Sequence, residues 1–142
     1  MISDSSVSWR TSRRGHSFSA IGPLEAEILA AVWEREPDAA RVRDLYEELR
    51  AKRSIAYTTV MTVMSNLVKK GLLACDTSSI AYLYRAAIPA DEVAGEVLES
   101  LVALLYRGRT EAAATRLLGL ESALSEAQLE ELRRYARTLL TG

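Results

Sequence analysis

The stretch SIAYTTVMTVMSNLVKKGLL, which runs from Ser54 to Leu73, decides the fold because its apolar residues recur at helical spacing. Successive residues of an α-helix turn by 100°, so each position can be placed around Val60 as the centre of a buried side. Four small or apolar residues fall within about 45° of Val60, and a fifth, Val63, lies about 60° away: the four are Ala56, Met64, Leu67 and Gly71. The pattern predicts a helix over residues 56–70 with one side in a core.

The opposite side of this helix is polar and acid-free. Four of its positions recur at i, i+4, i+7 and i+11, and two more polar residues flank them: Thr58, Thr62, Ser65 and Lys69, then Thr59 and Asn66. A solvated helix usually carries Glu and Lys here, because Thr, Ser and Asn each disfavour helix by a few tenths of a kcal/mol. No Asp or Glu lies between Ala51 and Ala74. Short hydroxyls and an amide suit phosphates and base edges of DNA, so a DNA-binding face competes with a solvated or protein-binding face.

Two helices are predicted before this stretch and a hairpin after it. Pro23 suits the first turn of one helix and Pro37 ends it. The second helix has apolar positions at i, i+3, i+4 and i+7: Val42, Leu45, Tyr46 and Leu49. Apolar runs over residues 72–75 and 80–86 flank turn-forming residues 76–79, which indicates a β-hairpin. This helix-turn-helix order with a hairpin after it strengthens the DNA interpretation.

The two ends of the chain differ from this middle part in charge. Residues 1–21 are rich in Ser and Arg, have a net charge of 3 − 1 = +2 and lack periodicity, so we expect a flexible arm. Residues 22–88, which contain the three predicted helices and the hairpin, carry nine basic and nine acidic residues. Residues 89–142 carry six basic and nine acidic residues and return to helical spacing.

The predicted helices of residues 89–142 have more apolar surface than a short segment buries alone, so we expect them to pair with a second copy. Ser125 and Gln128 fit a capping box at the start of the last helix. The residues expected in the dimer contact share apolar helical stripes: Val93, Val97, Leu101, Leu105, Leu129, Leu132 and Leu139.

Composition excludes several classes of protein. The chain is 49% hydrophobic and 26% charged, which is typical of a folded and not a disordered chain. No run approaches the roughly 20 apolar residues of a membrane span, and no apolar stretch follows the N-terminal arginines. A cytoplasmic protein without a membrane partner is therefore expected. Cys75 and His16 are each the only residue of their type, so a metal or catalytic centre is not expected. We expect no cofactor and no enzyme.

The segments AYTTVMTVMSNLVKKGLL and AYLYRA together resemble the BlaI/MecI/CopY family of penicillinase and copper repressors. LEAEILAAVWE, which contains Trp33, and VRDLYEEL resemble the first two helices of that family. LLYRGRTEAAATRLL and LSEAQLEELRRYARTLL resemble its dimerisation helices. The resemblance covers about residues 22–142.

The resemblance implies a mainly α fold with a small β-hairpin wing, plus a C-terminal helical dimerisation region. It implies a homodimer that binds a palindromic operator in double-stranded DNA and blocks transcription, with helix 56–70 in the major groove. Thr58, Thr59 and Thr62 carry over as groove-facing residues. The full set expected to contact DNA adds neighbouring polar and basic residues: Arg41, Lys52, Arg53, Tyr57, Ser65, Asn66, Lys69, Lys70 and Arg85.

The chain departs from the family pattern at its wing and at its switch. The wing turn has no Arg or Lys, so Arg85 is the nearest phosphate contact, and Tyr82 and Tyr84 can pack in the core or contact DNA. The Asn-Phe bond cut in penicillinase repressors and the Cys-x-Cys pairs of copper repressors are absent. A sensor protease stays a candidate partner without a visible cut site. The alternative function is a winged-helix protein-interaction module without specific DNA binding.

Overall fold

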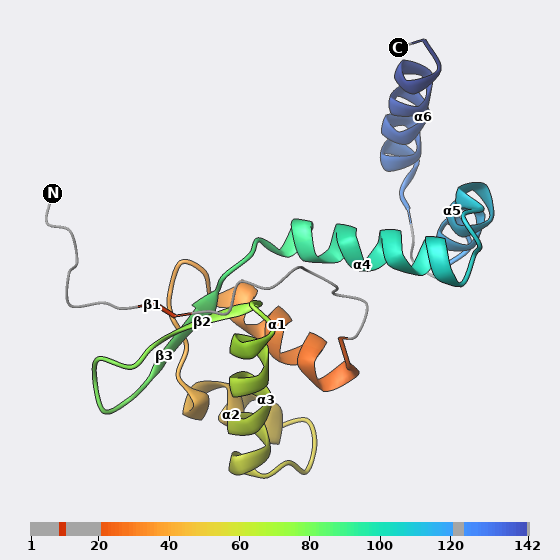
Figure 1. The fold of residues 1–142 in the computed structure, drawn as a ribbon. Coiled ribbons are helices and arrows are strands. Elements are labelled where there is room, and N and C mark those ends of the chain that lie inside the picture. Colours follow the sequence, from red (N-terminus) through yellow and green to blue (C-terminus); the bar gives the residue numbers. More distant parts are fainter. Residues whose placement is uncertain (1–8, 11–20, 121–123, 142) are drawn as a thin grey trace, which may run out of the picture. The chain divides into compact units, whose positions relative to one another are not determined.

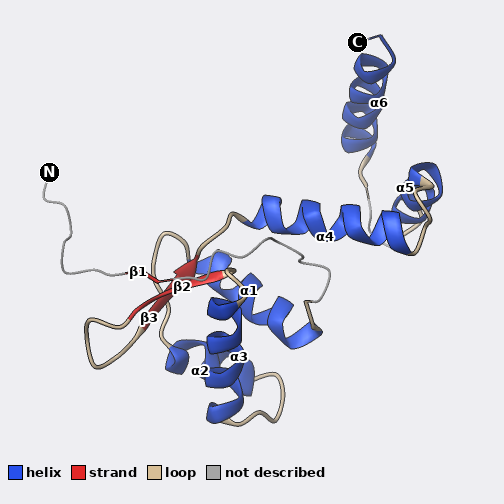
Figure 2. Ribbon diagram, viewed as in Figure 1, coloured by secondary structure: helices blue, strands red, loops and turns tan. Residues whose placement is uncertain are grey.

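The computed structural model describes residues 9–10, 21–120 and 124–141, most of them in helices (Figures 1 and 2). The elements follow in the order β1 (Trp9–Arg10), α1 (Pro23–Arg35), α2 (Val42–Arg50), α3 (Tyr57–Lys69), β2 (Leu73–Asp76), β3 (Leu83–Ala86), α4 (Ala90–Leu104), α5 (Thr110–Leu118) and α6 (Glu126–Thr141). Contacts divide the chain into two compact units, one up to Leu98 and one from Glu99. None of the described helices is long and apolar enough to cross a membrane.

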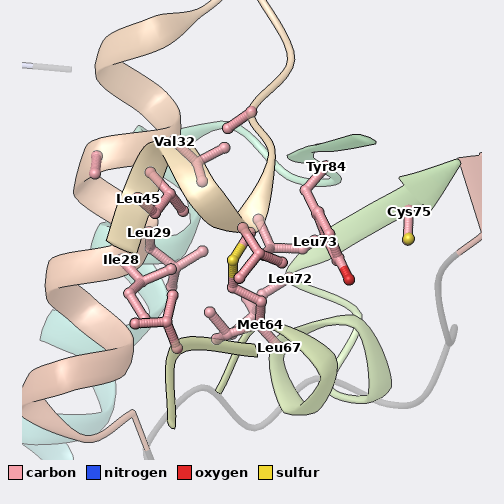
Figure 3. Close-up of a cluster of buried hydrophobic side chains, with 14 of the residues drawn as sticks. Ile28, Leu29, Val32, Leu45, Met64, Leu67, Leu72, Leu73, Cys75 and Tyr84 are labelled. Atoms are coloured by element: carbon pink, nitrogen blue, oxygen red, sulfur yellow. The ribbon is translucent and has the colours of Figure 1, made fainter. Parts of the chain in front are cut away.

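The core of the first unit is built by the apolar sides of α1, α2 and α3 together with β2. Figure 3 shows these side chains converging from separate elements. Each helix contributes residues that are at most 1% exposed: Ile28, Leu29 and Val32 from α1, Leu45 and Leu49 from α2, and Val60, Met64 and Leu67 from α3. The predicted order of three helices and a hairpin, and the predicted mainly α fold with a small wing, are confirmed.

The wing sheet has three strands in the order β1-β2-β3. β2 and β3 pair antiparallel from Leu73↔Ala86 to Asp76↔Leu83. β1 pairs antiparallel with the other edge of β2, which the sequence did not predict because two residues carry no periodic pattern. The rest of the predicted arm, with His16 and Phe18, lies outside the described residues.

The turn between β2 and β3 is longer than predicted. The second strand was expected over residues 80–86, but it begins at Leu83. Side chains of the turn satisfy its backbone instead: the Asp76 carboxylate accepts a hydrogen bond from the Ser78 N–H at 2.9 Å, and the Ser79 hydroxyl donates to the Ala81 carbonyl at 2.8 Å. Such local bonds compete with strand pairing.

Gly71 connects α3 to the wing. Its φ of +82° is left-handed, a conformation that costs a residue with a Cβ about 1–2 kcal/mol. The Gly71 N–H donates to the Val68 carbonyl at 3.0 Å and the Leu72 N–H to the Leu67 carbonyl at 2.9 Å, which closes the end of the helix. β2 therefore starts directly beside the end of α3.

The first half of α4 belongs to the first unit. Val93 is 2% exposed in its core and Val97 packs against that core. The Trp33 indole N–H donates to the Ile88 carbonyl at 3.2 Å, which fastens the chain to α1 just before α4 begins. The compact unit thus extends to Leu98, and Val93, predicted in the dimer contact, is buried in the core of its own chain.

The second unit leaves most of its apolar side chains exposed. The predicted capping box at the start of α6 is confirmed, with the Ser125 N–H donating to the Gln128 side chain at 2.9 Å and the Gln128 N–H to the Ser125 hydroxyl at 3.2 Å. Yet α6 has no buried residue. Leu105, Leu132 and Leu139 are 75%, 47% and 64% exposed.

Candidate nucleic-acid interface

The outer face of α3 is exposed as predicted. Val60, Met64 and Leu67 are fully buried and hold the helix against the core. The polar residues of the opposite side and its flanks are all exposed: Thr58, Thr59, Thr62, Ser65, Asn66 and Lys69. Ala56, predicted in the buried stripe, is exposed because it caps the helix before its first turn. α3 thus presents hydroxyl, amide and ammonium groups to solvent.

The cations around α3 fall into two groups. Lys52 and Lys69 are exposed, and no ion pair joins either of them to another described residue. Arg53 contacts Glu27 at 2.6 Å, and Lys70 contacts Glu25 at 2.8 Å. The sequence showed no acid within residues 51–74, but the packing of α1 brings two carboxylates to the ends of α3.

Glu25 also closes the N-terminus of α1. Its carboxylate accepts a hydrogen bond from the Gly22 N–H at 3.0 Å, in the first turn of the helix, where a negative charge is favoured. The Glu25 side chain is 15% exposed. The ion pair with Lys70 therefore rests on a carboxylate that the helix already holds in place.

The wing contributes few charges to this face. Of the two tyrosines that could pack in the core or contact DNA, Tyr84 packs in the core, since it is 5% exposed. Tyr82 is 49% exposed. Arg85, predicted to contact phosphate, is exposed on β3. The turn residues 77–82 are all exposed and none of them is charged.

An open groove separates α3 from the wing turn, with a volume of about 570 Å³. Its lining includes exposed apolar side chains and two arginines from the start of α2: Tyr57, Met61, Ile80 and Tyr82, with Arg41 and Arg43. Arg41 and Tyr57 were predicted as contacts, but Arg43, Met61 and Ile80 were not. For Met61, the sequence held a signal: its position on the helix, beside the polar side and away from the buried side, could have indicated an exposed apolar residue next to the predicted DNA-binding face.

Cys75 is a structural residue of β2. It is 7% exposed, and burial raises the pKa of its thiol, an effect to which the Asp76 charge adds and which a hydrogen bond to Tyr84 partly opposes. Burial also raises the pKa of Tyr84. A raised thiol pKa disfavours a redox switch, which needs an accessible thiolate. Among the described residues, no group of three or more His, Cys, Asp or Glu side chains is placed to hold a metal ion.

Comparison with known proteins agrees with this arrangement. The sequence model described as the penicillinase repressor matches residues 21–138. Two proteins named transcriptional regulator BlaI, from Mycobacterium tuberculosis strains CDC 1551 / Oshkosh and ATCC 25618 / H37Rv, are each 38% identical over 95 residues. The match spans 66% of this chain and 67% of each relative. These matches confirm the resemblance seen in helix three and the wing: the chain belongs to the penicillinase repressor family of transcriptional regulators.

Proposed function

We propose that this protein is a sequence-specific transcriptional repressor that binds a palindromic operator as a homodimer. α3 enters the major groove of each half-site. The observation that carries the proposal is the exposed, hydroxyl-bearing face of α3, whose opposite side is fixed by Val60, Met64 and Leu67 at 0% exposure. A helix held rigidly by its core side can present short polar groups to base edges at a defined depth.

The exposed residues of this face divide into two roles. Thr58, Thr62 and Asn66 have side chains short enough to read base edges from a helix that lies close to the groove floor. Lys52 and Lys69 act on phosphates, which position the domain without reading sequence. Arg41, just before α2, lines the groove beside α3 and reaches a phosphate from there.

A second copy of the chain covers the apolar surface of the second unit. α6 buries none of its own side chains, and Leu132, Tyr135 and Leu139 are 47%, 63% and 64% exposed. A second α6 of the same sequence offers the matching surface. Pairing sets two α3 helices about 34 Å or a multiple of it apart along DNA. A repressor must reach the chromosome in order to bind its operator. This requirement fits the cytoplasmic location expected from the sequence.

The structure also offers an argument for the alternative, a protein-interaction module. Glu27 and Glu25 neutralise Arg53 and Lys70, and the groove beside α3 is largely apolar. The exposure of Lys52 and Lys69 and the acid-free polar face favour DNA. A direct binding experiment separates the two functions.

The experiment places two carboxylates on the proposed face. Thr58→Glu with Thr62→Glu puts them one turn apart on the outer side of α3, where DNA phosphates repel them. The matched control is Ala26→Glu with Ala30→Glu, two exposed positions at the same spacing on α1. Binding to a fragment of the protein's own promoter is followed by fluorescence anisotropy.

The α3 variant is expected to lose promoter binding while its circular dichroism spectrum and sedimentation coefficient stay unchanged. The α1 control is expected to keep most of the affinity. If the α3 variant binds the promoter as tightly as the control does, α3 does not enter the major groove.

A further inference from the structure

The groove between α3 and the wing gathers most of the exposed apolar side chains of the first unit. The large apolar residues exposed in the described part of this unit are Tyr57, Met61, Ile80, Tyr82 and Leu98, at 42%, 44%, 104%, 49% and 44%. All of these except Leu98 line the groove. Single exposed apolar residues need no explanation, but a cluster around one hollow marks a binding surface.

The charges around the groove indicate what it binds. Arg41 and Arg43 line it, and no carboxylate stands among its described lining residues. A groove with apolar walls and a cationic edge suits an anion that also carries apolar groups. Double-stranded DNA meets both conditions, because each phosphate lies close to deoxyribose carbons and, at thymine, to a methyl group in the major groove.

Both walls of the groove are held in place. On α3, Tyr57, Met61 and Ser65 recur at i, i+4 and i+8 and form one line along the helix. The Tyr57 ring packs edge-on against Tyr46 with the ring centres 5.4 Å apart. On the wing, the bonds of Asp76 to Ser78 and of Ser79 to Ala81 fix the turn that carries Ile80.

We propose that this groove reads thymine, with Met61 as the specificity-determining residue. This inference rests on the proposed repressor function. Met61 lies on the flank of α3 that faces the groove, so a helix in the major groove places its thioether beside the C5-methyl groups of thymines. A flexible, polarisable side chain adapts to such a methyl group without a hydrogen bond. Ile80 forms the opposite wall, and Arg41 and Arg43 hold the neighbouring phosphates.

The test removes the methyl groups from the DNA. The promoter fragment is amplified with either dTTP or dUTP, which changes each thymine C5-methyl to hydrogen and leaves base pairing intact. The ratio of the two dissociation constants is then measured for the unchanged protein, Met61→Ala, Met61→Leu and Leu98→Ala. Leu98 is the matched control, since its 44% exposure equals that of Met61 and it does not line the groove.

We expect the unchanged protein to prefer the thymine fragment by about fifteenfold, because one buried methyl group contributes about fourfold and a dimer reads two half-sites. Met61→Ala should bring the ratio close to one, while Met61→Leu and Leu98→Ala should keep it. The dependence of affinity on salt should be the same for both fragments, since no phosphate contact changes.

Three results would overturn this inference. Equal binding of the unchanged protein to both fragments would remove thymine reading while leaving the repressor function intact. An unchanged ratio in Met61→Ala would assign the methyl contact to another residue. Failure of the unchanged protein to prefer its promoter over scrambled DNA would overturn the repressor function and thymine reading together.

Discussion

Replacing Glu27 by Gln should make the protein bind DNA more tightly. The Glu27 carboxylate lies 2.6 Å from the Arg53 guanidinium, which is a predicted phosphate contact. A phosphate that bonds the same guanidinium at about 2.9 Å would lie about 5 Å from this carboxylate. Two unit charges at that distance repel each other by about 0.8 kcal/mol in water, and physiological salt roughly halves this value. Two half-sites therefore gain about 0.9 kcal/mol, or about fivefold in affinity.

The variant should remain folded, because an exposed ion pair contributes at most about 1 kcal/mol. Affinity for the promoter fragment is measured by anisotropy at several salt concentrations. Release of Arg53 should steepen the slope of log affinity against log salt by up to about 0.9 per half-site.

Glu130→Gln is the matched control for Glu27→Gln. It removes the same charge from an ion pair on α6, where Glu130 contacts Arg133 at 3.4 Å. If Glu27→Gln tightens binding no more than Glu130→Gln does, only net charge has acted, and Arg53 does not face a phosphate.

Three further predictions concern the parts that hold this face in place. Gly71→Ala should lower the free energy of unfolding by about 1–2 kcal/mol, because φ at Gly71 is +82°; an unchanged urea midpoint would contradict this. Leu132→Asp with Leu139→Asp should turn the proposed dimer into a monomer in sedimentation velocity, since a second α6 cannot bury the new charges; an intact dimer would place the contact elsewhere. Burial raises the pKa of Cys75 above its ordinary value of 9.0, so the folded state holds this proton more tightly than the unfolded chain. The resulting stability is fully present below that value and is lost as pH rises above it towards the higher pKa of the folded state, so above about pH 9 the unchanged protein should lose stability more steeply than Cys75→Ala; parallel curves would exclude the effect.

The local architecture could be predicted because it depends on periodicity along short segments. Val60, Met64 and Leu67 recur at helical spacing, and this spacing alone assigned one side of α3 to the core. The capping box of Ser125 and Gln128 likewise depends on residues three apart. Such patterns specify which elements form and which side each one buries.

Features that depend on packing between distant segments could not be predicted in this way. The pair of Arg53 with Glu27 joins residues 26 apart, and the groove forms only when α3 lies beside the wing turn. The apolar stripe of α4 begins at Val93. Helical spacing shows that this side of the helix is buried, but it does not show whether the core of the same chain or a second copy buries it. The two-residue strand β1 is too short to leave a pattern.

The most direct measurement is an anisotropy titration of the purified protein against its own promoter fragment and a scrambled fragment, repeated over a range of salt concentrations. If α3 of a dimer reads the operator, the promoter should be bound saturably and far more tightly than the scrambled fragment. Affinity for the promoter should also fall linearly with log salt as phosphate contacts release counterions. Equal and weak binding to both fragments at every salt concentration would contradict DNA reading by α3 and favour a protein partner for its polar face.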